Sequence, residues 1–317
     1  MSSQRFADAP GAAGYPLPIS GPLSWQPGPT GYEARLRLSR VPAGSILVPS
    51  FACLDDLGHR WRIETALGDC ALAPVPWDCG LDDPQHGSAR ADAAPAGVLT
   101  SQVDCFHVHS ELPHAELVLR TTASSRPSHY LAVLSWRARA LSEVPVPDGS
   151  AALTRNPPAR SQMTRQAALA PRICSPTCVA MLHEHYTGRN DHDAIVAECH
   201  DPATDLYGVW PLALRAASRR GHLGAVEVFP DWQAPLAALR AGVALVTSIR
   251  YAQGELPGAA IAATAGHLVL VHGVTPERIA VNDPAAATDA QVPRGYPAEA
   301  FSRAWLRHRG AAYILPP

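Results

Sequence analysis

The stretch 172–178 reads Arg-Ile-Cys-Ser-Pro-Thr-Cys and places Cys174 two residues ahead of Pro176, where an apolar, helix-like segment begins. Proline is favoured in the first turn of a helix, because the N–H that it lacks would have no partner there. The Cys174 thiol therefore lies at the positive end of the predicted helix dipole, which stabilises a thiolate. Since the thiolate is the nucleophilic form of cysteine, the stretch predicts a reactive thiol at the front of a helix.

Two short motifs downstream supply an imidazole and a carboxylate. Gly266-His267 opens the apolar, strand-like run 268–271, and Asn282-Asp283-Pro284 ends the next strand-like run. Sixteen positions separate His267 from Asp283, so a single hairpin is enough to bring both side chains to the same end of adjacent strands. Asp283 would then hold the tautomer and the orientation of the imidazole, as in a generalised catalytic triad.

The first half of the chain has a different pattern. Residues 1–30 are rich in Pro and Gly, which predicts an irregular N-terminal arm. From 31 to 141, short segments such as Tyr32–Leu38 and Tyr130–Trp136 alternate apolar and polar residues between turns. Such alternation is typical of half-buried antiparallel strands, and several strands without a convincing helix predict a β-sandwich domain. The Pro-rich stretch 142–160 predicts a linker.

The second half, 161–317, combines helical and strand-like patterns. Prolines near the predicted helix starts and apolar runs later in the sequence together predict an α+β fold with a mostly antiparallel sheet. The predicted helices are 176–187, 210–221, 232–241 and 297–307, and the predicted strands are 243–250, 267–274, 278–282 and 311–315.

Composition excludes several classes of protein. The formal net charge of −2 gives no electrostatic case for binding nucleic acid or an anionic membrane. The N-terminal residues lack signal-peptide character, and no apolar run approaches the ~20 residues of a membrane span, so we expect a cytoplasmic protein. All 26 basic residues are arginine, which rules out a Schiff-base lysine. The seven cysteines are scattered and odd in number, which argues against a disulfide framework.

The sequence predicts no cofactor and no metal. Cys105, His107 and His109 alternate along a predicted strand and would share one face, with Phe106 and Val108 filling the core on the other. We expect the three potential ligands to face solvent. Because no fourth ligand stands nearby in the sequence, the pattern is a weak zinc signal.

Six short motifs stand in order within 161–317. They are Ser161-Gln162-Met163, Cys174-Ser175-Pro176-Thr177, Tyr207-Gly208-Val209-Trp210-Pro211, Gly254-Glu255-Leu256-Pro257-Gly258-Ala259, Gly266-His267-Leu268 and Asn282-Asp283-Pro284-Ala285. With these motifs the stretch resembles the papain-like cysteine peptidases of the bacteriocin-leader-processing type, in particular a bacterial subgroup with an added N-terminal β domain. The resemblance covers about half of the chain and implies a papain-like fold for that half.

The resemblance implies a role for each matching position. Cys174 would be the nucleophile, His267 the general base and acid, and Asp283 the residue that orients the imidazole. Gln162 matches the upstream glutamine whose side-chain amide forms the oxyanion hole together with the backbone N–H of the cysteine. Gln166 is the competing candidate for that donor.

The expected reaction is cleavage of an amide bond in a peptide substrate, through a thioester on Cys174. We predict that Trp210 and Gly266 contact the substrate. The alternative for Trp210 is a place in the core of the second domain. Two alternatives stay open. With an amine as the acceptor, the protein would be an acyltransferase or transpeptidase. With an inactive hydrolase fold, it would be a binding or scaffold protein.

Overall fold

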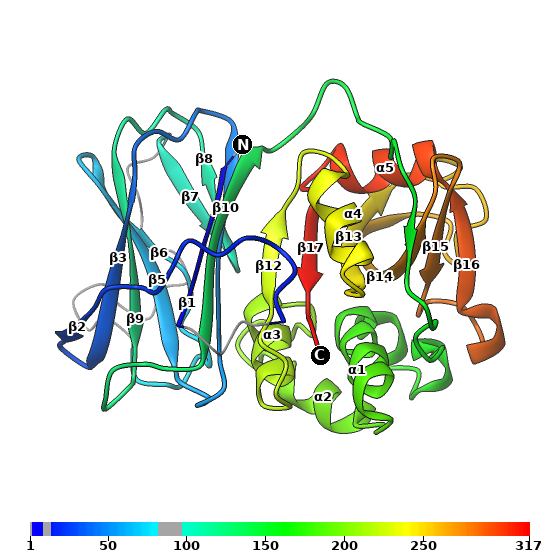
Figure 1. The fold of residues 1–317 in the computed structure, drawn as a ribbon, viewed down its shortest axis with the longest axis horizontal. Helices are drawn as coiled ribbons and strands as arrows, with labels where there is room; N and C mark the ends of the chain where they lie inside the picture. The colour runs from blue at the N-terminus through cyan, green and yellow to red at the C-terminus, as the bar shows by residue number, and fades with distance from the viewer. Residues whose placement is uncertain (1, 9–13, 82–96) are drawn as a thin grey trace.

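The computed structural model describes residues 2–8, 14–81 and 97–317. In these residues, the first half of the chain forms two five-stranded antiparallel sheets (Figure 1). The first sheet has the order β1 (Ser2–Ala7), β10 (Tyr130–Ala138), β4 (Ser45–Cys53), β8 (Cys105–Val108) and β7 (Leu99–Gln102). The second has the order β2 (Trp25–Gly28), β3 (Gly31–Leu38), β9 (Ala115–Thr121), β5 (His59–Thr65) and β6 (Gly68–Ala71).

The sheet that contains β4, β8 and β10 is buried on both of its faces. Phe106 belongs to a hydrophobic core shared with the second sheet, whereas Cys105 belongs to the core of the second half of the chain. The prediction that Cys105 and His107 face solvent is therefore wrong, because their exposed fractions are 0% and 6%. Alternation in the sequence separates the two faces of a strand, but it does not reveal what covers the second face.

Residues 1–30 were predicted to be irregular, and this prediction is wrong for two segments. β1 pairs antiparallel with β10, in a register that runs from Ser2 opposite Trp136 to Ala7 opposite Leu131. β2 pairs with β3 in the other sheet. Both are edge strands. A short edge strand is held in a sheet mainly by backbone hydrogen bonds, which require no alternation of apolar and polar residues in the sequence.

The second half is built on a seven-stranded antiparallel sheet. Its order is β12 (Ala225–Val228), β17 (Ala311–Ile314), β13 (Leu245–Tyr251), β14 (Thr264–Val274), β15 (Arg278–Asn282) and β16 (Pro293–Pro297), and β11 (Ala151–Ala152) also pairs with β14. The α-helices in the described residues are α1 (Cys174–Thr187), α2 (His192–Glu198), α3 (Trp210–Ser218), α4 (Gln233–Arg240) and α5 (Ala298–Leu306). In Figure 1, α1 and α2 lie below this sheet and α5 lies above it.

Each helix and strand predicted for the second half overlaps one in the structure. The short strands β12 and β16, of four and five residues, were not predicted. Such short strands are set by the strands with which they pair, β17 for β12 and β15 for β16, rather than by a local pattern. Within the described residues, no helix has both the length and the apolar character needed to cross a membrane.

The Pro-rich stretch 142–160 is attached to the second half along part of its length. β11 pairs with the end of β14. The carbonyl oxygens of Pro157 and Pro158 accept hydrogen bonds from Nδ2 of Asn282, at 3.1 and 3.2 Å. This segment therefore packs beside the end of β15, next to Asp283.

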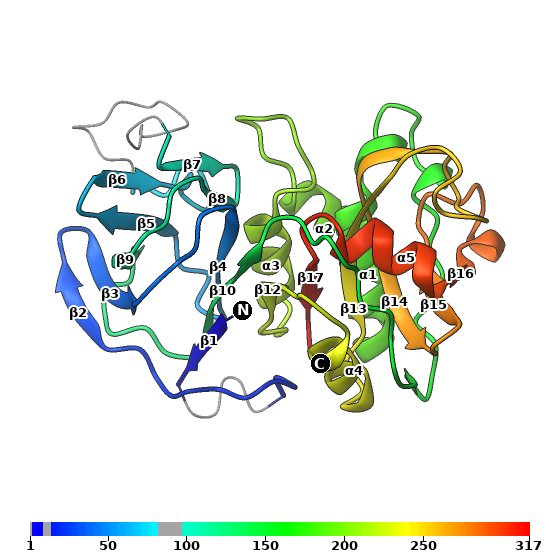
Figure 2. The ribbon, with the colours of Figure 1, turned by 90° about the horizontal axis from the view of Figure 1, so that it is seen from above.

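The strand β12 is an edge strand of the seven-stranded sheet, and the first half of the chain covers it. Figure 2 shows β12 beside β4 and β10. The hydroxyl of Ser50 accepts a hydrogen bond from the N–H of Val226, at 3.0 Å, and the hydroxyl of Ser135 accepts one from the N–H of Val228, at 3.1 Å. These side chains satisfy backbone donors that an exposed sheet edge would leave open.

A buried ion pair also joins the two halves. Glu227 of β12 is fully buried, and its carboxylate accepts hydrogen bonds from Arg5, at 2.7 Å, and from the hydroxyl of Tyr15, at 2.6 Å. Arg137 of β10 donates to the backbone carbonyls of Phe229 and Leu306, at 2.5 and 2.7 Å. The two halves therefore meet through specific polar bonds as well as through a shared apolar core.

Candidate active site

Cys174 is the first residue of α1, two positions earlier than the predicted helix start. The short 3-10 helix η2 (Ala170–Arg172) leads the chain into α1, and the N-cap residue Ile173 makes no side-chain cap hydrogen bond. No capping side chain therefore competes for the first N–H groups of the helix. As a residue, Cys174 is partly exposed, and the backbone N–H of Ser175 donates to its sulfur.

The hairpin of β14 and β15 brings His267 and Asp283 together. The two strands pair in a register that sets Leu270 opposite Asn282. Nε2 of His267 and Oδ1 of Asp283 are 2.8 Å apart, and the two residues are 3% and 0% exposed. Because Nε2 is hydrogen-bonded to Asp283, the hydrogen bond between His267 and the Cys174 thiol involves the other ring nitrogen, Nδ1.

Asp283 has two further hydrogen-bond donors. The hydroxyl of Tyr296 donates to Oδ2 at 2.6 Å, and the N–H of Ala285 donates to Oδ1 at 3.0 Å. Tyr296 is fully buried on β16 and lies opposite Ile279 of β15. Sequence reasoning missed Tyr296, because no local motif marks it and only the pairing of β15 with β16 carries its hydroxyl to Asp283.

The charges of these three side chains stabilise one another. Burial opposes a thiolate at Cys174, but the hydrogen bond and the charge of His267 outweigh it and lower the pKa of the thiol. Burial also opposes an imidazolium at His267, but the carboxylate of Asp283 and the thiolate raise its pKa to about 10. Burial likewise opposes a carboxylate at Asp283, but the charge and the hydrogen bond of His267 outweigh it and lower the pKa of the carboxyl. The arrangement favours a thiolate beside an imidazolium.

Gln162 lies between the segment before α1 and the loop after Asp283. Its backbone N–H donates to the carbonyl of Pro284 at 2.8 Å, and its side-chain Nε2 donates to the carbonyl of Ala170 at 2.6 Å. Nε2 carries a second hydrogen. Gln162 is 3% exposed, and among the described residues its Oε1 has no hydrogen-bond partner, whereas the competing Gln166 is exposed. Of the two glutamines, Gln162 is the buried donor.

Cys174 differs from the neighbouring cysteines in the pKa of its thiol, which is lowered. Cys178 lies one turn further along α1, is fully buried, and donates to the carbonyl of Leu268 at 3.5 Å. Burial raises the pKa of Cys178, and it raises those of Cys105 and Cys199 as well. A lowered pKa and partial exposure occur together at Cys174.

The two predicted substrate-contacting residues lie in different surroundings. Trp210 is 4% exposed at the start of α3. Its backbone N–H donates to Oδ2 of Asp104 at 3.3 Å, and the guanidinium of Arg309 lies 5.7 Å from the centroid of its ring. These contacts place Trp210 at the junction of the two halves of the chain. Gly266 is exposed beside His267, and the space where a Cβ would stand is open. Contact of either residue with a substrate stays a prediction.

A family model, the Peptidase_C39 like family, matches residues 155–313. The chain belongs to this family. The match includes Gln162, Cys174, His267 and Asp283, so the resemblance read from the sequence motifs is confirmed at the level of the family. Membership of the Peptidase_C39 like family supports a peptidase function. The two N-terminal sheets lie outside the matched residues.

No curated protein matches the chain. Among solved structures, a double glycine motif protease from an AMS/PCAT transporter, crystallised in complex with the leader peptide, is similar at 17% sequence identity. The similarity covers 53% of this chain and 98% of that chain, with a TM-score of 0.35.

Proposed function

We propose that the protein is a papain-like cysteine peptidase in which Cys174, His267 and Asp283 form the catalytic triad. The observation that carries the proposal is the ordered chain of hydrogen bonds from thiol to imidazole to buried carboxylate. The lowered pKa of Cys174 and the raised pKa of His267 support it, because together they favour the thiolate and the imidazolium of the reactive ion pair.

The proposed reaction proceeds through an acyl-enzyme. The Cys174 thiolate adds to the carbonyl carbon of a peptide bond, and the resulting oxyanion accepts hydrogen bonds from the second Nε2 hydrogen of Gln162 and from the N–H of Cys174. The imidazolium of His267 gives its proton to the departing amine as the C–N bond breaks. A water molecule then loses a proton to His267 and attacks the thioester, which releases the acid and restores the thiolate.

The substrate is proposed to be a peptide that lies across the exposed start of β14. Gly266 precedes His267 there, and the open space around its Cα leaves room for a peptide backbone. A side chain at this position would narrow the approach to Cys174. Gly266→Val is therefore expected to raise KM for peptide substrates, with a small effect on folding, since Gly266 lacks a positive φ.

The domain organisation is part of the proposal. We propose that residues 161–317 form the peptidase domain and that the two sheets within 31–141 form a β-sandwich domain. The hydrophobic core with members from both sheets, among them Leu36 and Phe106, supports the sandwich. The segment 142–160 would connect the two domains while packing against the second.

Alkylation with iodoacetamide at pH 6 tests the nucleophile. Cys174 is expected to react at least about tenfold faster than Cys79, the other cysteine that is partly exposed, because only a thiolate attacks the reagent quickly. His267→Ala removes the partner that lowers the pKa of Cys174, so labelling at this position should slow. Equal labelling of Cys174 and the other six cysteines would overturn the proposal.

Hydrolysis is tested with a library of quenched fluorescent peptides. The wild-type protein should cleave members of the library, and Cys174→Ala should abolish cleavage. Cys178→Ala provides the matched control on the same helix, since its buried thiol takes no part in the proposed reaction. A Cys174→Ala protein that retains the activity would contradict the assignment.

A further inference from the structure

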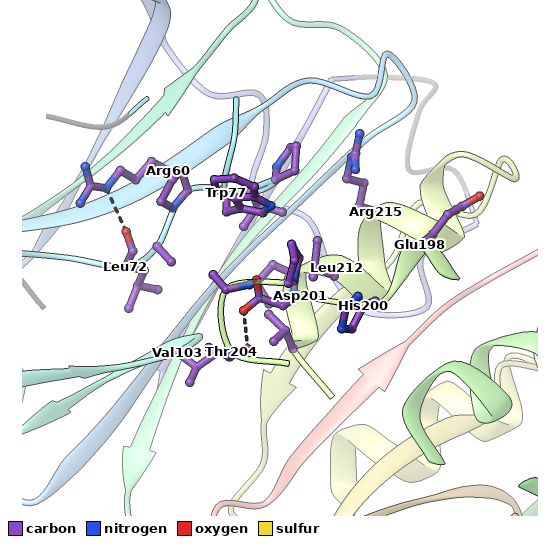
Figure 3. A pocket seen from close by; sticks show the side chains of 18 of the residues that line it. Arg60, Leu72, Trp77, Val103, Glu198, His200, Asp201, Thr204, Leu212 and Arg215 are labelled. Atoms are coloured by element: carbon purple, nitrogen blue, oxygen red, sulfur yellow. Dashed lines mark hydrogen bonds between the residues drawn. The ribbon is translucent and has the colours of Figure 1, made fainter. Parts of the chain in front are cut away.

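A cavity of about 560 Å³ lies between the two halves of the chain, away from the triad. Figure 3 shows side chains from both halves around it, with Trp77 and Val103 from the first half and His200 and Leu212 from the second. Binding sites for small molecules and peptide side chains commonly have volumes of about 300–1,000 Å³. The cavity is therefore large enough to hold more than solvent.

Apolar side chains form much of its wall. Trp77 and Val103 are 51% and 46% exposed, unusually high values for large apolar side chains in the described residues. On the same wall, Val75, Val209 and Leu212 form a small hydrophobic cluster that joins the two halves. Covering exposed indole and aliphatic surface is favourable by about 25 cal/mol per Å². Such a wall favours an apolar occupant.

The charged side chains on the wall already have partners in the protein. Glu198 accepts from Arg220 at 2.8 Å, and Arg215 donates to Asp56 at 2.6 Å. Asp201 accepts from the hydroxyl of Thr204. Arg60 donates to the backbone carbonyl of Leu72 at 2.9 Å. These bonds engage the charged groups within the protein, so the exposed apolar surface of Trp77 and Val103 is what the wall chiefly offers to an occupant.

A short series of contacts connects this cavity to the nucleophile. His200, on the cavity wall, stacks on Tyr207 with ring centroids 4.8 Å apart and bonds to Asp205 at 2.9 Å. Arg172 pairs with the same Asp205 at 2.8 Å and lies 5.2 Å from the ring centroid of Tyr207. Arg172 stands two residues before Cys174. The loop between α2 and α3 therefore has the cavity on one side and the start of α1 on the other.

We propose that this cavity binds an uncharged, apolar segment of the peptide substrate, away from the bond that is cleaved. This inference rests on the proposed peptidase function, and it gives the N-terminal sheets a part in choosing the substrate. The exposed apolar surface of the wall sets the chemistry of the segment. The contacts of His200 and Arg172 with Asp205 and Tyr207 link the cavity wall to the start of α1, and we expect one extended peptide to occupy the cavity and reach Cys174.

A binding experiment on the full chain tests the proposal without depending on catalysis. The protein carries Cys174→Ala, and the probes are two fluorescein-labelled dodecapeptides, one with leucine alternating with asparagine and one with serine in place of each leucine. Fluorescence anisotropy measures their dissociation constants. We expect the leucine peptide to bind at least about tenfold more tightly, because it alone covers the apolar wall. Equal affinity for the two peptides would overturn the proposal.

Two variants test whether the leucine peptide binds in this cavity. Trp77→Ala removes the largest exposed side chain of the wall, and Val103→Asp introduces a charge among apolar groups. Both side chains are about half exposed, so neither change disturbs a buried core. Each is expected to weaken binding of the leucine peptide about tenfold or more. The control is Leu67→Asp, which adds the same charge at another exposed apolar residue, outside the cavity, and should leave the affinity unchanged.

The outcomes separate this inference from the proposed function. If Cys174 fails the alkylation and hydrolysis tests while the leucine peptide binds and Trp77→Ala weakens it, the proposed chemistry fails and the cavity assignment stands. If peptides are cleaved but the leucine peptide binds equally well to wild-type, Trp77→Ala and Val103→Asp backgrounds, the cavity assignment fails alone.

Discussion

At Cys174 and His267, burial and neighbouring charges shift the pKa values in opposite directions, and their balance decides whether the thiolate and the imidazolium form. Burial favours the neutral thiol and the neutral imidazole, while their mutual attraction and the carboxylate of Asp283 favour the ion pair. Asp283 stays negatively charged inside the protein because His267, the N–H of Ala285 and the hydroxyl of Tyr296 all form hydrogen bonds with its carboxylate oxygens.

The pH dependence of kcat/KM follows from this ion pair. Activity should rise as Cys174 loses its proton, at a pH below the ordinary thiol value, and fall as His267 loses its proton at about 10. Asp283→Asn removes the charge that raises the pKa of His267. The alkaline limb should then move to lower pH, and kcat/KM should fall by about a hundredfold or more. Steady-state kinetics across the pH range measure both effects, and an unmoved alkaline limb would contradict this account.

Tyr296→Phe is expected to weaken the support of Asp283. The change removes a donor from a fully buried carboxylate, and the free energy of unfolding should fall by about 1–3 kcal/mol. Urea denaturation measures the loss, and kcat/KM should fall as well. Tyr251→Phe is the matched control, since its hydroxyl donates to the carbonyl of Ile261 at 3.1 Å and not to the triad. Equal kinetic effects of the two changes would show that Tyr296 has no special part.

At the scale of elements, the start of α3 depends on a residue of the other half. Its N-cap residue Val209 provides no side-chain cap, and the N–H of Trp210 instead donates to Asp104, in the turn between β7 and β8. Asp104 is 6% exposed. A helix start that relies on a distant carboxylate cannot be identified from a local capping motif.

Asp104 makes stability depend on pH. Burial raises its pKa to about 6, against the opposing charge of Arg309. Because this value exceeds that of an unfolded aspartate, the contribution to stability is full below about pH 4 and is lost as the pH rises through 6. Asp104→Asn does not ionise and keeps an acceptor for Trp210. Relative to wild type, its free energy of unfolding should gain up to about 3 kcal/mol between pH 4 and pH 8. Urea denaturation at both pH values checks this, and a constant difference would refute it.

The elements of the second half show where local patterns are sufficient. The predicted helix 176–187 and the predicted strand 278–282 are both present because each carries an apolar pattern of its own. β12 and β1 were missed for a shared reason. Both are short edge strands, and their places follow from what packs on them, such as Ser50, Ser135 and β10.

At the scale of the whole molecule, the two halves share one continuous core. Ile46, Val48 and Leu131 of the first half belong to the same hydrophobic cluster as Trp232 and Trp305 of the second. Arg5 and Tyr15 bind the buried Glu227, so the interface is also specific in its polar contacts. The two halves are therefore expected to unfold together.

Residues 155–317 expressed alone should be unstable. Without the first half, Glu227 loses both of its donors, the edge of β12 is exposed, and apolar surface of the shared core meets water. We expect aggregation, or a midpoint of thermal unfolding well below that of the full chain. Size-exclusion chromatography and circular dichroism compare the two proteins. A fragment that is monomeric and as stable as the full chain would contradict the shared core.

The sequence by itself determined the place of Cys174 at the front of a helix, the order of Cys174, His267 and Asp283, and the hairpin that joins the last two, because each depends on residue types and spacing within a short stretch. Only the tertiary structure decided the burial of Cys105 and His107, the donor Tyr296, the support of α3 by Asp104 and the cavity beside Trp77. Each of these arises where segments far apart in the chain pack together. A contact of that kind leaves no local period in the sequence, since its partners are chosen by the packing of whole sheets and helices.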